Sequence, residues 1–285
     1  MSILDTIIHR ANNEETIRAI ILTGSRAGKG PVDELSDFDL AIFTRDAKKY
    51  TNDNSWLDQT AQVLVCVEDQ KNNDFGSIDA IPTRLVIFKD GTKVDFAFYP
   101  IAALEKPIPK LPIAYNSGYT VLLDKDDITK ALPAPIFTIQ VTEKPSSKEF
   151  DRVVREFFFE VYHVAKYLQR NDLWHAKFRD WAAKEFLLKM IEWHELATHN
   201  WSYDVHYLGK RMEFWVNSTT WKDLHKTFGH FDAADGWIAL EATIELFRNL
   251  AIYTSKLLEY EYPIEVDRDM TTLHKKMCLN AVLLQ

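Results

Sequence analysis

The sequence predicts an α+β fold, in which an N-terminal domain with a mixed β-sheet is followed by a C-terminal α-helical bundle. Three observations predict it. Short β-rich runs bounded by turn residues fill about the first hundred positions, six prolines follow between residues 107 and 145, and long helical patterns with almost no proline come after them. Such a shift in composition is typical of a domain boundary. We therefore expect one domain over residues 1–145 and a helical domain over residues 146–285.

The N-terminal half is expected to alternate between strands and short helices. An amphipathic helix should cover residues 4–13, and another should lie around Trp56. The turn Lys89-Asp90-Gly91 between two β-rich runs indicates a hairpin. The expected strands are residues 17–23, 38–44, 62–67, 83–88, 92–99 and a short one within 118–124.

The C-terminal half is expected to consist of helices alone. Ser146 and Glu149 have the spacing of a capping box, and the apolar residues from 150 to 168 then form one wide helical face. A second helix is expected over residues 173–198. The tryptophans of the helical half are interpreted as core more than as a platform for a ligand: Trp174, Trp181, Trp193, Trp201 and Trp215. Further helices are expected near residues 204–216, 219–228 and 236–259.

Composition and charge restrict the class of protein. The 285 residues include 46% hydrophobic ones, which is ample for a core, and the net charge is −8. No run of Lys or Arg forms the basic patch that a nucleic-acid-binding protein needs, and an acidic chain suits a cationic partner better. We find neither a signal peptide nor a stretch of about 18 apolar residues, so we expect a cytoplasmic protein without a membrane span. The oligomeric state stays open, with a monomer among the possibilities.

Three aspartates on two expected strands are candidates for metal binding. Asp37 and Asp39 stand two residues apart at the start of one strand, so they share a face, and Asp95 lies within a later strand. Neighbouring carboxylates repel one another, and a divalent cation such as Mg²⁺ removes that repulsion. The alternative for the first pair is a turn with two solvent-facing carboxylates. Asp95 makes the metal site the stronger interpretation.

A Gly-Ser turn precedes these aspartates. Gly24 and Ser25 follow an apolar strand, where a bare backbone allows close approach to a phosphate, and Arg26 offers a positive charge. The combination predicts metal-assisted nucleotidyl transfer, with Asp37 and Asp39 as metal ligands. Asp95 is expected to be a metal ligand, the base that accepts the hydroxyl proton, or both.

Two other motifs are excluded by their spacing. The segment from Gly24 to Gly30 lacks the four residues between glycines, and the Ser or Thr after Lys, that a P-loop requires. His194 and His199 are five residues apart, whereas a zinc-protease helix places its histidines four apart on one face.

The motifs of the first half resemble those of the aminoglycoside adenylyltransferases, within the DNA polymerase β-like nucleotidyltransferase superfamily. Segments of the helical half extend the resemblance to the streptomycin (aminoglycoside 6-) adenylyltransferase group, so that it covers most of the chain. The matching segments are Gly24-Ser25-Arg26, Ser36-Asp37-Phe38-Asp39, Lys93-Val94-Asp95-Phe96, Leu173-Trp-His-Ala-Lys177, Met190-Ile-Glu-Trp193 and Leu208-Gly-Lys210.

The resemblance implies ATP and Mg²⁺, transfer of AMP to an aminoglycoside hydroxyl, with the 6-hydroxyl of streptomycin as the expected acceptor, and release of pyrophosphate. The antibiotic would lie between the two domains. Lys210 is a candidate for contact with the triphosphate, and the alternative is an ordinary surface lysine. Because streptomycin carries guanidinium groups, acidic side chains should surround it. The candidates on the second expected helix are Asp172, Asp180, Glu185 and Glu192.

Two other functions are compatible with the same motifs. One is a nucleotide-binding module without turnover, but the three intact aspartates argue against it. The other is an adenylyltransferase that modifies a protein hydroxyl, and the sizeable helical domain favours a small-molecule acceptor instead. The loop between Arg26 and Asp37 departs from the pattern of the streptomycin group, which leaves the acceptor less defined than the reaction.

Overall fold

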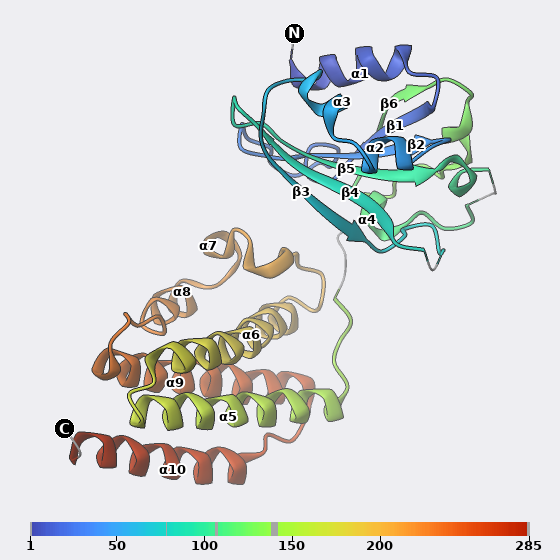
Figure 1. The fold of residues 1–285 in the computed structure, drawn as a ribbon. Helices are drawn as coiled ribbons and strands as arrows, with labels where there is room; N and C mark the ends of the chain where they lie inside the picture. Colours follow the sequence, from blue (N-terminus) through green and yellow to red (C-terminus); the bar gives the residue numbers. More distant parts are fainter. Residues whose placement is uncertain (1, 78, 106–107, 138–141, 284–285) are drawn as a thin grey trace. The chain divides into compact units, whose positions relative to one another are not determined.

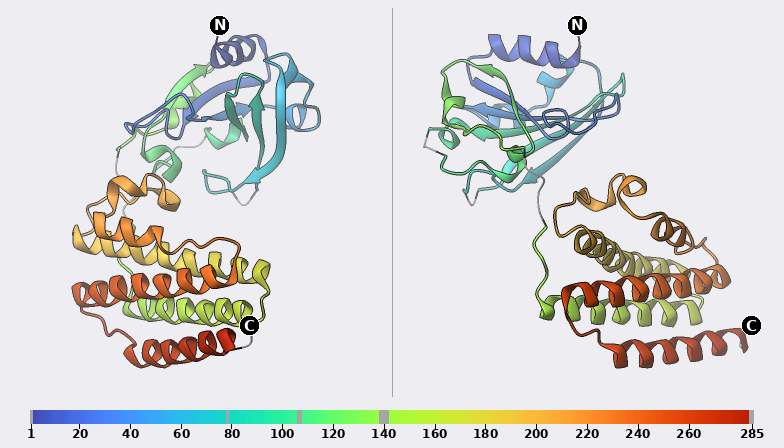
Figure 2. Two further views of the ribbon diagram at one scale, coloured as in Figure 1. Left: turned by 90° about the vertical axis from the view of Figure 1, so that its left-hand side faces the viewer. Right: turned by 180° about the vertical axis from the view of Figure 1, so that it is seen from behind.

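The computed structural model describes residues 2–77, 79–105, 108–137 and 142–283, which we call the described residues (Figure 1). The chain divides into two compact units, Met1–Gln140 and Val141–Gln285. The first is a mixed β-sheet with short helices on its faces, and the second is helical (Figures 1 and 2). The predicted α+β fold class is confirmed.

Unit 1 is built on a six-stranded sheet with the strand order β3-β4-β5-β2-β1-β6. Neighbouring strands run antiparallel except β2 and β5, which are parallel. The parallel pair lies at the centre of the sheet, and its two strands therefore begin at the same edge. The strands are β1 (Ile17–Thr23), β2 (Phe38–Thr44), β3 (Val63–Lys71), β4 (Ile81–Phe88), β5 (Lys93–Pro100) and β6 (Thr120–Asp124).

The two faces of this sheet bury separate apolar clusters. On one face Phe96 and Phe98 are fully buried beneath α1 (Ile3–Asn13), α2 (Lys48–Thr51) and α3 (Ser55–Asp58). Full burial of such a side chain contributes about 2–3 kcal/mol. The other face is covered by α4 (Ile113–Asn116) and by the short 3₁₀ turns η1 (Ile101–Ala103) and η2 (Ile128–Ala131). Both faces of the sheet are thus covered.

Unit 2 packs four long helices against one another (Figure 2). The first of them starts where Ser146 Oγ accepts a hydrogen bond from the backbone N–H of Glu149, 3.2 Å away. At the centre the rings of Phe157 and Phe247 stack with their centroids 3.6 Å apart. The long helices are α5 (Ser147–Gln169), α6 (Leu173–Thr198), α9 (Ala233–Leu258) and α10 (Ile264–Leu283), and the shorter elements are η3 (Tyr207–Gly209), α7 (Met212–Trp215) and α8 (Ser218–His225).

Two parts of unit 2 differ from the sequence-based expectations. The helix expected near residues 204–216 is wrong, because His206, Leu208 and Arg211 have positive φ angles that interrupt it. Only η3 and α7 form there. Helix α10 was not predicted, since charged residues break up its apolar pattern. No helix within the described ranges is both long and apolar enough to cross a membrane.

Candidate active site

The parallel pairing of β2 and β5 brings the predicted carboxylates together. In the register of this pair Asp39 lies directly opposite Asp95, and Phe38 lies opposite Val94. Directly paired residues project from the same face of a sheet. Asp37 precedes β2 by one residue, so all three aspartates gather where the two parallel strands begin. This grouping joins positions 56 residues apart in sequence, as the contact of Asp37 with Lys93 shows.

Gly24 gives Asp39 the space that its side chain occupies. The residue has a φ of +68°, which is unfavourable for any side chain. A Cβ atom here would overlap Asp39 Oδ2 and would lie 2.8 Å from its Cγ. The sequence suggested a glycine for close approach to a phosphate. The structure adds that the same glycine is needed for the position of a carboxylate.

Ser25 lies at the exposed corner of the turn that follows β1. The backbone N–H of Ala27 donates to Gly24 O, and that of Gly28 donates to Ser25 O, at 3.2 and 3.3 Å. Within the part of the chain that the structure describes, the Ser25 hydroxyl makes no hydrogen bond. It is therefore available to a ligand beside the carboxylates.

Arg26 contacts the chain on both sides of Asp37. Its Nε donates to Ser36 O at 2.8 Å, and its Cζ lies 4.1 Å from the ring centroid of Phe38. Nη2 also donates to Asp33 O at 3.3 Å. Its guanidinium therefore holds the loop that leads into β2. Its expected contact with phosphates stays a prediction.

Lys93 is the cation of this group, and the sequence-based reasoning did not select it. Its Nζ donates to Asp37 Oδ2 at 2.7 Å and to Asp95 Oδ2 at 2.9 Å. The signal was present in the sequence, because Lys93 precedes Asp95 by two positions and therefore shares its face. Burial alone would lower the pKa of Lys93, but the two hydrogen bonds outweigh it and the pKa lies above the usual value.

The carboxylates carry more negative charge than their surroundings compensate. Burial raises the pKa of Asp39, and the charges of Asp95 and Asp37 raise it further, against a smaller opposing effect of Lys93. Asp95 Oδ1 is buried and has no hydrogen-bond partner in the described chain. A buried acceptor without a partner is costly and is uncommon unless a ligand satisfies it.

The donor set fits a divalent cation by its chemistry. Three carboxylates supply the hard oxygen ligands that Mg²⁺ prefers, and one of their buried oxygens has no other partner. The described residues nevertheless contain no group of three acidic, histidine or cysteine side chains close enough to hold one ion. The Lys93 ammonium bridges two of the carboxylates instead.

The four acidic candidates at the start of α6 and within it differ in their surroundings. Asp180 forms an ion pair with the buried Lys184, whose Nζ lies 2.7 Å from Asp180 Oδ1 and 2.9 Å from Thr243 Oγ1. Glu185 and Glu192 are seven residues apart, which places them within about 20° of each other around the helix. Asp172 stands just before α6 and is exposed. Of the four candidates, only Glu185 and Glu192 therefore share a face.

The face of Glu185 and Glu192 also carries exposed aromatic rings. Trp174, Phe178 and Trp181 lie on this stripe of α6 and expose 82%, 65% and 63% of their surface. The expectation that the tryptophans of the helical half belong to the core is wrong for Trp174 and Trp181, whereas Trp193 and Trp215 are buried. Burial raises the pKa of Glu192 to about 7, with only a small opposing effect of Lys189.

Lys210 belongs to unit 2 and follows η3 directly. Its side chain is exposed, while its carbonyl accepts a hydrogen bond from Trp215 Nε1 at 2.8 Å. Leu208 and Arg211 adopt positive φ angles on either side of it. Such strained conformations of non-glycine residues cluster at functional sites.

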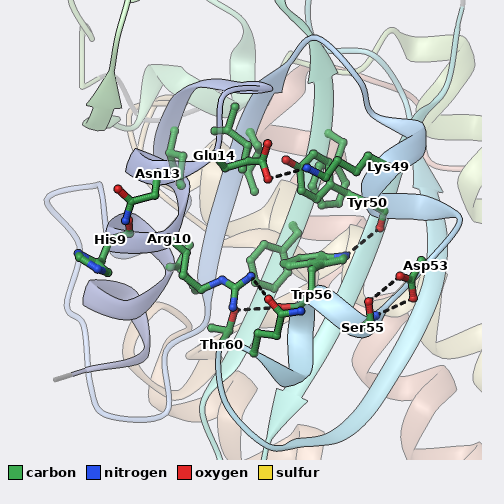
Figure 3. A pocket seen from close by; sticks show the side chains of 18 residues that line it. His9, Arg10, Asn13, Glu14, Lys49, Tyr50, Asp53, Ser55, Trp56 and Thr60 are labelled. Atoms are coloured by element: carbon green, nitrogen blue, oxygen red, sulfur yellow. Dashed lines mark hydrogen bonds and ion pairs between the residues drawn. The ribbon is translucent and has the colours of Figure 1, made fainter.

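A hollow of about 560 Å³ lies on the opposite face of the sheet from the aspartates (Figure 3). Its apolar floor includes Phe96 and Phe98, and its polar groups pair with one another. Arg10 Nη2 donates to Gln59 Oε1 at 2.7 Å, and Lys49 Nζ donates to Glu14 Oε2 at 2.6 Å (Figure 3). With these groups already satisfied, the hollow supplies none of the carboxylate chemistry described above.

A mixed sheet with carboxylates on two adjoining strands beside a Gly-Ser turn defines the class of a nucleotidyltransferase. The chain belongs to the streptomycin adenylyltransferase family, whose model matches residues 1–277. It is 26% identical over 265 residues to the aminoglycoside 6-adenylyltransferase of Campylobacter jejuni, with 92% of this chain and 90% of that protein covered. Identity to the enzyme of the same name from Bacillus subtilis is 27% over 270 residues, with 91% of each covered. The crystal structure of an aminoglycoside 6-adenyltransferase from Bacillus subtilis superposes with a TM-score of 0.46 at 23% identity, covering 96% of this chain and 97% of that one.

Proposed function

We propose that the protein transfers AMP from ATP to a hydroxyl of an aminoglycoside, with the 6-hydroxyl of streptomycin as the acceptor, and releases pyrophosphate. One observation carries the proposal: Asp39 and Asp95 face each other across the parallel pair, with Asp37 adjacent and the exposed Ser25 beside them. The names of the relatives from Campylobacter jejuni and Bacillus subtilis support the choice of reaction and of acceptor class.

The aspartates would divide the chemistry between them. Mg²⁺, when bound, would neutralise the triphosphate and keep its α-phosphorus aligned for in-line attack. Asp37 and Asp39 would hold the metal. The acceptor oxygen forms a bond to the α-phosphorus, the bond to pyrophosphate breaks, and the hydroxyl proton passes to Asp95, whose Oδ1 has no other partner. Asp95 could also contribute a metal ligand.

The remaining predicted residues of unit 1 would hold the nucleotide. The Ser25 hydroxyl, which makes no bond within the described residues, would donate to a phosphate oxygen. Gly24 would keep the backbone of this turn open to the phosphates. Lys210 would contribute a further positive charge to the triphosphate from unit 2, and the strained backbone around it supports a functional role.

The stripe on α6 would recognise the cationic antibiotic. A guanidinium group binds carboxylates through paired hydrogen bonds and stacks on aromatic rings, and the stripe offers both kinds of partner. Glu185 and Glu192 would supply the carboxylates, while Trp174 and Trp181 would supply the rings. Asp180 is less suited, because it already compensates the charge of Lys184. Asp172 remains a candidate at the start of the helix.

The test is an assay of pyrophosphate release with ATP, Mg²⁺ and streptomycin, combined with mass spectrometry of the antibiotic. We expect pyrophosphate and a product that carries one adenylyl group, with both absent in the Asp37→Asn variant. Nucleotide scanning with CTP, GTP and UTP checks the preference for ATP. If no aminoglycoside supports release of pyrophosphate, the acceptor assignment is wrong.

A further inference from the structure

Lys93 occupies the position between two of the carboxylates where a bound cation would lie. Its Nζ is 2.7 Å from Asp37 Oδ2 and 2.9 Å from Asp95 Oδ2. About one third of the side chain is exposed, so the ammonium has solvent beside it into which it can move. Lys93 is also the first residue of β5, where its backbone position is fixed by the same strand that carries Asp95.

A divalent ion would need the same oxygens. Asp95 keeps its second oxygen, Oδ1, buried and without a partner, so it can bind an ion from a second direction. No three ligand side chains in the described ranges surround one point, and Lys93 lies between two of the oxygens that an ion would need. One ammonium against three carboxylates still leaves the group with two negative charges. This residual charge attracts a divalent cation, which neutralises the oxygens better than a lysine does.

We propose that Lys93 is a displaceable internal cation. Its ammonium holds Asp37 and Asp95 together before metal binds, leaves them when the metal arrives, and then contacts the phosphate oxygens of the nucleotide. A lysine suits this role, because it is a compact point charge on a flexible stem and binds phosphates in that form. The inference rests on the proposed metal-dependent function and goes beyond it by coupling the two binding events.

Lys93 would have opposite effects on the affinity for metal alone and on the affinity for nucleotide. Metal alone must compete with Lys93, so the lysine weakens metal binding. Nucleotide binding gains the ammonium that the metal has released, so the lysine strengthens it. Such a linkage is reciprocal, and each ligand should raise the affinity for the other.

Lys71 provides a matched control. It is the other lysine that lowers the pKa of Asp39 through its charge, so it acts on the same group of carboxylates from a distance. Its Nζ pairs with Asp74 Oδ2 at 2.8 Å and lies over the ring of Tyr99, and neither partner is one of the three aspartates. A Lys71→Met variant therefore tests the effect of lost positive charge without the loss of a direct contact.

The first experiment measures binding of Mn²⁺ alone by electron paramagnetic resonance in the wild type, Lys93→Met and Lys71→Met. We expect Lys93→Met to bind Mn²⁺ about tenfold more tightly, because the competing ammonium and its hydrogen bonds to Asp37 and Asp95 are removed. Its affinity for a non-hydrolysable ATP analogue in the presence of Mn²⁺ should fall about tenfold. Lys71→Met should change either affinity by less than about threefold.

Two results would overturn the inference while leaving the proposed function in place. One is Mn²⁺ binding by Lys93→Met that is no tighter than in the wild type, and the other is an equal gain in Lys71→Met. A wild-type protein that binds no Mn²⁺, with or without nucleotide, would instead contradict the metal-dependent function itself.

A second experiment needs no substitution and so does not depend on the folding of a variant. Lysine side chains of the wild-type protein are modified with an amine-reactive reagent, and the extent at each position is read by mass spectrometry. Lys93 should become more reactive with Mn²⁺ alone and protected once the ATP analogue is added, while Lys71 stays unchanged. Protection of Lys93 by Mn²⁺ alone would contradict the displacement.

Discussion

The carboxylates of unit 1 and those of α6 are held in different ways. Asp39 and Asp95 are placed by backbone pairing of two parallel strands, and Gly24 leaves the space that Asp39 needs. Glu185 and Glu192 are placed by helical periodicity alone; Glu185 is exposed and Glu192 is half-buried. The first arrangement is rigid and suits chemistry that depends on exact distances. The second spreads its carboxylates along one stripe of a helix, which would suit recognition of a cationic ligand by charge.

The difference has an energetic counterpart. Repulsion and burial raise the pKa of Asp39, and burial raises that of Glu192 to about 7. Both carboxylates therefore lower the stability of the free protein near neutral pH, because a raised pKa of an acid means that its charged form is disfavoured in the folded state. Residues that reduce stability are expected where binding a cation restores it. The following substitutions separate the two regions by activity and by stability.

Asp39→Asn should have the largest effect on activity. Losing this proposed metal ligand should reduce turnover roughly a thousandfold, or about 4 kcal/mol in the transition state. The melting temperature should stay equal or rise, because the substitution removes a charge that burial disfavours. Pyrophosphate release and calorimetry measure the two effects. A variant with near-normal turnover would remove Asp39 from the metal site.

Gly24→Ala should have the second largest effect on activity. We expect turnover to fall about a hundredfold, as for a displacement of about 1 Å at a reacting group, because Asp39 must shift. The new Cβ overlaps Asp39 Oδ2 and meets an unfavourable φ of +68°. Gly30→Ala is the control, because nothing lies within 4 Å of a Cβ at that position. Equal activities of the two variants, compared by steady-state kinetics, would show that Asp39 does not depend on the space at Gly24.

Asp39 and Gly24 also show how far the sequence could predict the candidate site. Alternation along a strand was enough to select Asp37, Asp39 and Asp95 as candidates. It was not enough to pair Asp39 with Asp95, because a parallel register is set by packing between distant segments. The clash at Gly24 is likewise a contact across two strands, and no local pattern encodes it.

The fold was predictable where local patterns are strong. Strands β1 and β2 and helix α6 begin and end where the periodicity and the turn residues predict. The segment around Leu208 was not predictable, because a positive φ at a bulky residue is held in place by its surroundings and opposes its own preference. Helix α10 depends on packing against α5, and its own sequence is a weak signal.

Asp180→Asn sharpens the comparison within α6, because its effect should be on stability. The substitution leaves the ammonium of Lys184 buried without its ion-pair partner, and we expect a loss of about 2 kcal/mol in the free energy of unfolding. Asp172→Asn, at an exposed position, should change it by less than about 0.5 kcal/mol. Urea denaturation measures both values. If the variant instead loses affinity for the antibiotic without losing stability, Asp180 takes part in recognition of the antibiotic.

Glu192→Gln should raise the free energy of unfolding, whereas Asp180→Asn should lower it. The folded-state pKa of about 7 lies above the usual value of 4.5, so the penalty for ionising Glu192 is absent below pH 4.5 and complete above pH 7. The variant should therefore be more stable than the wild type by about 1 kcal/mol at pH 8, with no gain at pH 4.5. Denaturation at the two pH values measures the gain. The KM for streptomycin should rise severalfold at pH 8, and an unchanged KM would exclude Glu192 from recognition.

Trp181→Ala should have the smallest effect, and it tests whether the aromatic rings of α6 belong to recognition. A cation–π contact at an exposed site contributes about 0.5–1 kcal/mol, so the KM for streptomycin should rise about threefold with little change in kcat. Since 63% of the side chain is exposed, the melting temperature should hardly change. Trp193→Ala, at a position that is 3% exposed, should instead destabilise the protein by about 3–5 kcal/mol. If Trp181→Ala leaves the KM unchanged while Glu192→Gln raises it, the cationic substrate is held by the carboxylates without the rings.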